Sequence, residues 1–143
     1  IGKNVKRSHV VSVMMQYSIL DRRAEETCLP LLQENDIAVL ARGSLAGGLL
    51  VNKPVNTYLN YTEDEVRKAA AAVHAISGMS RTPAQTSIRF VLQQQGITAA
   101  IVGVRSMEQL NDAIAVTHTP LLTDNEMTHL RSCIPVNYYE QHR

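Results

Sequence analysis

Three short apolar runs stand out along the chain, and each has the make-up of a buried β-strand. They are residues 10–15, 37–41 and 97–102. Continuous apolar runs of this length are typical of strands covered on both faces in a parallel sheet. Between the first two runs, apolar positions recur at helical spacing, which predicts a helix from a cap at Asp21 to about Asn35, kinked or shifted in register at Pro30. Strand, helix and strand with short links are the βαβ signature, so we expect parallel pairing.

Four further helices are predicted from capping sequences, in which Ser or Thr is followed three residues later by Glu or Gln. The pairs are Thr62 with Glu65, Thr82 with Gln85, Ser106 with Gln109, and Thr123 with Glu126. Two of these helices fall between the second and third strands, which gives an α/β protein of three strands and about five helices. Three parallel strands leave unpaired edges. A closed eight-stranded α/β barrel needs roughly 250 residues, so residues 1–143 are expected to form a single partial domain of about half that size.

The composition, with 45% hydrophobic and 19% charged residues, is that of one globular domain. A formal net charge of +1 without a basic cluster excludes the electrostatic footprint of a protein that binds nucleic acid or an anionic membrane. No apolar run approaches the ~20 residues of a membrane helix. No secretory signal opens the chain, so a cytoplasmic protein is expected.

The cysteines and histidines do not indicate a metal site. Cys28 and Cys133 fit reduced, buried thiols better than a disulfide framework. The five histidines lack metal-ligand spacing with one another or with either cysteine. No hydrolytic constellation is apparent either, so neither metal-ligating nor catalytic residues are assigned.

Ligands of parallel α/β proteins bind at the carboxyl ends of strands, and three such places carry suitable residues. After the first strand, Gln16 could bond an amide, and Tyr17 could stack on a flat ring or simply pack at the rim. After the second strand, the small residues of Gly43–Gly48 would let backbone N–H groups approach a diphosphate. The spacing of these glycines matches neither the dinucleotide fingerprint nor the P-loop, so an ordinary flexible loop is the alternative.

The third place is the start of a helix after the last strand, at Gly103–Ser106. Free N–H groups at a helix N-terminus attract an anion, Ser106 adds a hydroxyl, and Arg105 adds a fork-shaped cation suited to phosphate. A capped helix with a surface arginine is the alternative interpretation.

Three segments carry a resemblance to a known family. Residues 17–25, 40–50 and 101–110 resemble the C-terminal half of the aldo-keto reductases, and bacterial members near the potassium-channel β-subunit branch are the most similar. The resemblance implies a (β/α)8 barrel of the TIM type that binds NADP(H). The three strands would then be its sixth, seventh and eighth.

The resemblance also implies roles for individual residues in binding NADP(H). Four residues would lie on the diphosphate loop: Gly43, Leu45, Gly47 and Leu49. Arg105 and Ser106, after Gly103, would face the 2′-phosphate, and Gln109 would approach the ribose or adenine. Arg42 would stand at the nicotinamide end, and Gln16 is counted with the cofactor-binding residues from its place at the end of the first strand.

Some positions depart from the family pattern. Met14 stands where the family has the glutamine that holds the nicotinamide amide, and Arg42 stands where it has a ring-stacking aromatic residue. Ala113 replaces an adenine-contacting asparagine, and Gly47 replaces a common basic residue. The phosphate contacts are therefore better preserved than the nicotinamide contacts.

The family's catalytic Asp, Tyr, Lys and His belong to the first half of the barrel, and no segment here matches their motifs. The leading hypothesis is the cofactor-binding half of an NADP-dependent reductase of carbonyl substrates, inactive without its N-terminal half because it has no proton donor. Two alternatives remain. One is a non-catalytic half-barrel that dimerises as a nucleotide-binding or scaffold protein, and the other is a non-functional folding remnant.

Overall fold

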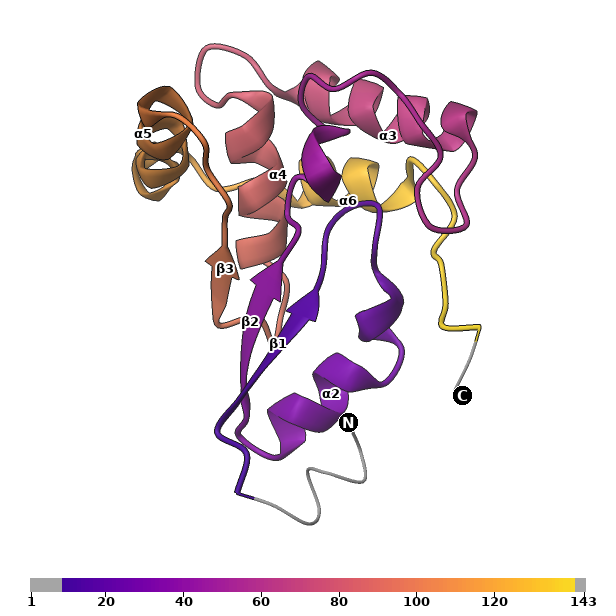
Figure 1. Cartoon of the computed structure of the whole chain (residues 1–143), viewed down its shortest axis with the longest axis vertical. Helices are drawn as coiled ribbons and strands as arrows, with labels where there is room; N and C mark the ends of the chain where they lie inside the picture. Colours follow the sequence, from indigo (N-terminus) through magenta and orange to yellow (C-terminus); the bar gives the residue numbers. More distant parts are fainter. Residues whose placement is uncertain (1–8, 141–143) are drawn as a thin grey trace.

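The computed structural model describes residues 9–140, and its centre is a parallel sheet. The strands are β1 (Ser12–Gln16), β2 (Ala38–Arg42) and β3 (Ala99–Ile101), in the order β1-β2-β3 (Figure 1). Gln16 and Ile101 both lie in register with Arg42, so the three carboxyl ends meet at one edge. The predicted strands and their parallel pairing are confirmed.

Five α-helices accompany this sheet within the described residues, and the expected order is confirmed. They are α2 (Cys28–Glu34), α3 (Glu63–Ile76), α4 (Pro83–Leu92), α5 (Met107–Ala115) and α6 (Asp124–Ser132). There are also three short 3₁₀ turns in the described residues. η1 (Arg23–Glu25) lies between β1 and α2, η2 (Ala46–Gly48) follows β2, and η3 (Val116–His118) follows α5. Helices α3 and α4 separate β2 from β3, as expected.

The prediction of one helix from Asp21 to about Asn35 was wrong. The segment is divided into η1 and the seven-residue helix α2, which begins after Thr27. Asp21 does not cap a helix, because its carboxylate accepts two hydrogen bonds from Arg23. Pro30 falls in the first turn of α2, where its missing N–H would have had no acceptor within the helix.

Three of the four predicted capping boxes are complete, at Thr62, Thr82 and Thr123. The fourth differs in one bond. Ser106 accepts from the N–H of Gln109, but the Gln109 side chain accepts from the N–H of Arg105 at 2.8 Å. This arrangement ties the turn before α5 to the first turn of the helix.

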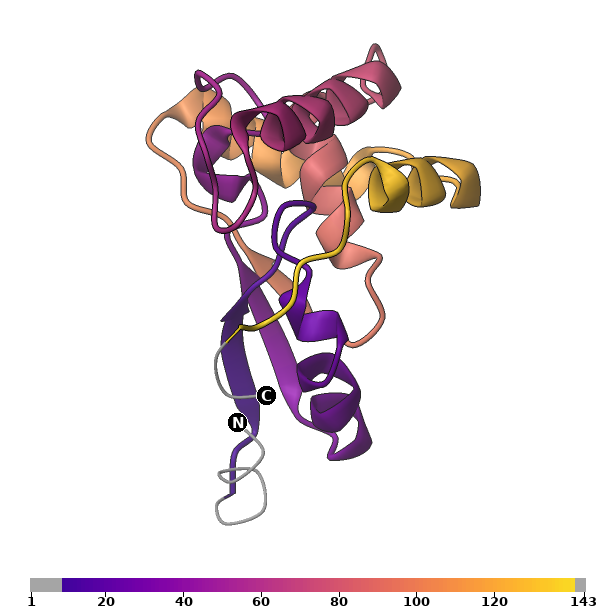
Figure 2. The same cartoon turned by 90° about the vertical axis from the view of Figure 1, so that its right-hand side faces the viewer.

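Residues 9–140 cover only one face of the sheet, whereas the apolar runs predicted cover on both faces. Met15, Val39 and Ala41 are buried on the side where α2 and α4 lie (Figure 2). On the opposite face Met14 is 57% exposed and Ile101 is 45% exposed. Among the described residues β1 and β3 each have one pairing partner, so the sheet is open at both edges.

The structure supports the packing interpretation of Tyr17, although this residue lies in the core and not at the rim. Its ring stacks on that of Phe90 with centroids 6.1 Å apart, and its hydroxyl donates to Glu25 at 2.5 Å. Burial and the nearby Glu25 carboxylate raise the pKa of Tyr17 well above its usual range. The tail also packs back onto the body, where the buried Asn137 accepts from the N–H of Arg22 at 3.1 Å.

Candidate ligand-binding cleft

A cleft of about 720 Å³ opens at the carboxyl ends of β2 and β3. One wall is the loop 43–53 and the other is the segment 101–113, which contains the start of α5. The N-cap and first two turns of α4 complete the lining, with Thr82, Ala84 and Ile88. The structure therefore brings together two places that lie about sixty residues apart in the sequence and that were predicted separately.

Seven of the ten predicted binding residues line this cleft. They are Gly43, Leu45, Gly47, Gly103, Arg105, Ser106 and Gln109. The other three lie beside it. Gln16, at the end of β1, donates from its amide to the Tyr58 hydroxyl at 2.7 Å, Arg42 is exposed at the end of β2, and Leu49 packs against the core.

The glycine-rich loop follows a conformation that depends on its glycines. Gly43 has φ +80°, a left-handed conformation that only glycine adopts readily, and a Cβ there would lie 3.2 Å from Cγ of Gln16. Backbone bonds of 2.8 Å from Ala46 to Gly43 and from Gly48 to Leu45 close the turns that follow. At Gly47 a Cβ would meet nothing within 4 Å, which leaves the backbone open to a close-fitting group.

The start of α5 forms the opposite wall and favours an anion. The Ser106 oxygen accepts from Gln109 at 3.2 Å, so its own proton can be donated into the cleft. The Arg105 guanidinium is exposed beside the free N–H groups and positive dipole of the helix N-terminus. A phosphate between Arg105 and Ser106 would meet donors of both kinds.

Lys53 is a cleft residue that our sequence reasoning missed. Its side chain lies along Gly48, where a Cβ would come within 3.2 Å of its carbons. This lysine brings a cation to the loop that lacks a basic residue at Gly47. Its position six residues beyond Gly47 was the available signal, but only the fold of the loop shows that it turns back to the cleft.

Asp112 was also missed, and it joins the two helices that border the cleft. Its carboxylate accepts from Thr82 Oγ1 at 3.0 and 3.1 Å and from Gln85 Nε2 at 2.8 Å. Because Thr82 is also the N-cap of α4, these contacts fix the start of α4 against α5.

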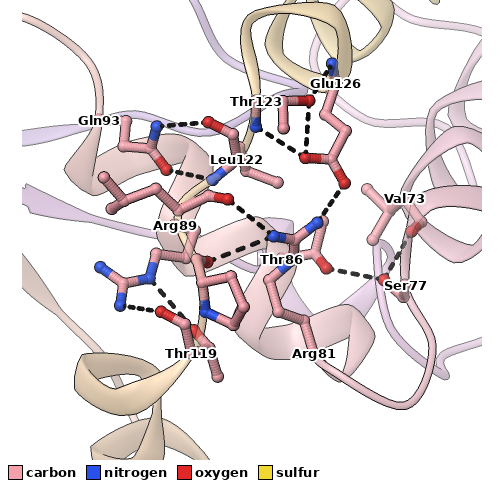
Figure 3. Close-up of polar contacts among 12 residues, drawn as sticks. Val73, Ser77, Arg81, Thr86, Arg89, Gln93, Thr119, Leu122, Thr123 and Glu126 are labelled. Carbon is pink, nitrogen blue, oxygen red and sulfur yellow. Dashed lines mark hydrogen bonds and ion pairs between the residues drawn. The ribbon is translucent and has the colours of Figure 1, made fainter.

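The chain that follows α5 is clamped by side chains of α4 and of the turn before it (Figure 3). Arg89 donates to the carbonyl oxygens of Val116 and Thr119 at 2.5 and 2.6 Å, and Gln93 makes two bonds with the backbone of Leu122. Arg81, only 5% exposed, donates to Leu121 and pairs with Glu126 (Figure 3). The C-terminal half of α5 and the chain that follows it are therefore held against α4.

Electrostatics favour the charged form of Glu126 in this clamp. Burial opposes its ionisation, but hydrogen bonds from Thr123 and the charge of Arg81 outweigh that effect and lower the pKa of Glu126. Within residues 9–140 no cluster of three or more His, Cys, Asp or Glu could hold a metal ion. Cys28 and Cys133 are half-buried free thiols, and none of the helices in this part of the chain could cross a membrane.

The chain belongs to the aldo/keto reductase family, whose sequence model matches residues 3–135. It is 37% identical to the uncharacterized oxidoreductase YqkF of Bacillus subtilis over all of this chain and 49% of that protein. It is also 30% identical to the uncharacterized oxidoreductase YrpG of the same organism, over 78% of this chain and 37% of YrpG.

Solved structures agree with this assignment. The holo form of aldo-keto reductase AKR11C1 from Bacillus halodurans matches with a TM-score of 0.87 and 34% identity, over 99% of this chain and 49% of that one. The chain thus spans about half the length of these relatives, and the expected α/β partial barrel is confirmed. Aldo-keto reductases are oxidoreductases that generally use a nicotinamide cofactor.

Proposed function

We propose that this chain is the cofactor-binding, C-terminal half of an NADP(H)-dependent aldo-keto reductase, with β1, β2 and β3 as the sixth to eighth strands of the barrel. The observation that carries the proposal is the single cleft that joins the glycine loop to the start of α5. Residues 1–143 then form one partial domain of a cytoplasmic enzyme. Within the aldo-keto reductase family, the chain would be a bacterial member near the potassium-channel β-subunit branch.

The cleft residues suit the two phosphate-bearing parts of NADP(H). Arg105 and Ser106 would bind the 2′-phosphate, because a guanidinium and a hydroxyl at a helix N-terminus recognise a phosphate dianion. Backbone N–H groups between Gly43 and Leu49 would bind the diphosphate, with Lys53 supplying charge. Gln109 would lie by the ribose, and Gln16 and Arg42 by the nicotinamide.

Hydride transfer to the carbonyl carbon of a small-molecule substrate is the chemistry that the bound cofactor supplies. The proton for the carbonyl oxygen would come from a tyrosine outside this chain. By itself the chain would therefore bind the cofactor but not turn over substrate. No residue of this chain is proposed as catalytic.

Titration with NADPH and NADH, followed by cofactor fluorescence, tests the proposal, and a chain without tryptophan gives a low background. We expect NADPH to bind at least tenfold more tightly than NADH. Arg105→Ala should weaken NADPH by about 10- to 100-fold, the size of a charged hydrogen bond, and leave NADH nearly unchanged. Arg67→Ala, an exposed arginine paired with Asp64 on α3, is the matched control. Absence of NADPH binding at about 1 mM would overturn the proposal.

A second candidate function is a half-barrel that pairs with another copy and serves as a nucleotide-binding or scaffold protein. The open sheet face with exposed Met14 favours it, since such a face needs a cover. A stable dimer in solution that does not bind NADPH would support this scaffold alternative over the reductase.

A further inference from the structure

We propose that His74 is a positioning residue for the cleft, which holds the end of the glycine loop, residues 51–53, against α3. The observation is the contact between His74 Nε2 and the carbonyl oxygen of Val51, at 2.8 Å. The inference rests on the proposed function, because the ligand that the loop serves is the diphosphate of a dinucleotide.

The chemistry of this contact fixes the role of each partner. A carbonyl oxygen can only accept, so Nε2 of His74 carries the proton and donates. His74 lies in the last turn of α3 and is exposed, and Val51 is separated from it by 23 residues. The bond therefore joins the loop after β2 to the end of α3, a segment distant from it in the sequence.

The backbone bonds of the loop leave its end dependent on such a contact. The carbonyl oxygen of Gly48 receives the N–H groups of Val51, Asn52 and Lys53 at 3.1, 3.2 and 3.1 Å. One acceptor shared by three donors makes each bond weak. Leu50, fully buried, anchors the chain just before this turn, and His74 holds it just after.

The turn that His74 holds also forms part of the cleft wall, since Val51, Asn52 and Lys53 all line it. If the bond is lost, the turn can move away and take the Lys53 cation with it. The part of the ligand that suffers is the diphosphate, whereas a 2′-phosphate at Arg105 lies on the opposite wall. Loss of the bond should therefore weaken binding of ligands that carry the diphosphate and spare ligands that carry only the 2′-phosphate.

His74→Ala tests the proposal, with NADPH and 2′-AMP as probes and hydrogen exchange of the 51–53 amides as a measurement that needs no ligand. We expect about fivefold weaker NADPH binding, the size of one hydrogen bond, unchanged 2′-AMP binding, and faster exchange at 51–53. His74→Gln should restore both properties, because the Gln amide can place an N–H₂ donor near the former Nε2. His129→Ala, another exposed histidine in the last turn of a helix, is the matched control.

The outcomes separate this inference from the proposed function. Unchanged NADPH affinity and unchanged exchange in His74→Ala would overturn the role of His74. Equal weakening of NADPH and 2′-AMP, or a loss that His74→Gln does not reverse, would also overturn it, because either result means a general structural defect. If the wild-type chain does not bind NADPH, the proposed function fails and this inference fails with it. If the wild-type chain binds NADPH but His74→Ala changes neither NADPH affinity nor amide exchange, only the inference fails.

Discussion

Single residues determine the shape of the cleft, and Gly43 does so most directly. It ends β2, turns the chain with φ +80°, and leaves room for the Gln16 side chain at the end of the neighbouring strand. The sequence pattern marks this glycine as part of a loop, since small residues cluster there. It does not show that Gln16 is the neighbour, because strand register is set by the packing of the whole sheet.

Replacing Gly43 with alanine should reduce the free energy of unfolding by about 1–3 kcal/mol, through the left-handed backbone and the close approach to Gln16. Urea denaturation measures the change. Gly78→Ala is the matched control, because Gly78 has no positive φ and a Cβ there would meet nothing within 4 Å. Equal effects of the two substitutions would contradict the argument from conformation.

At the scale of elements, the helix starts with capping sequences were predictable, and the contacts between helices were not. The capping sequence at Thr82 predicts where α4 begins, because the cap depends on residues close in the sequence. The same pattern cannot show that Thr82 also donates to Asp112, thirty residues later. The segment after Asp21 shows where local pattern fails. The apolar spacing predicted one continuous helix, but the structure has a 3₁₀ turn and then a separate helix, α2.

The clamp between α4 and α6 predicts a pH dependence of stability. The pKa of Glu126 is lowered in the folded state, so its contribution is present above the unfolded pKa and is lost as pH falls through the folded one. Glu126→Gln should reduce the free energy of unfolding at pH 7 by about 1–3 kcal/mol, because the buried Arg81 loses its counter-charge. The difference from wild type should shrink toward pH 3.

Glu65→Gln is the matched control for this measurement. Glu65 closes the same type of capping box at the start of α3, and its pKa is lowered by bonds to Thr62, but it has no buried arginine as partner. The smaller loss is expected there. If the two variants lose equal stability, the cap and not the Arg81 pair accounts for the effect of Glu126.

At the scale of the whole molecule, the covered and open faces of the sheet explain why the apolar runs were partly misleading. Each run suits a strand buried on both sides, but Met14 and Ile101 lie on a face that no described segment covers. The chain belongs to a family of barrel proteins and spans about half the length of the solved relative that it matches. Composition and periodicity cannot distinguish a strand that is covered here from one that is covered only by a further part of the barrel.

The open face should therefore drive association of the isolated chain. We expect the solution mass of the 15.8 kDa chain to rise with concentration in light scattering. Met14→Ser should reduce this rise, because it removes apolar surface from the open face. Met79→Ser, at a methionine in the turn between α3 and α4 that is more exposed than Met14, should leave the rise unchanged. A constant monomer mass would mean that the open face does not draw copies together, which leaves the remainder of a barrel as its expected cover; an equal effect of both substitutions would mean that exposed methionine in general, and not the sheet face, drives association.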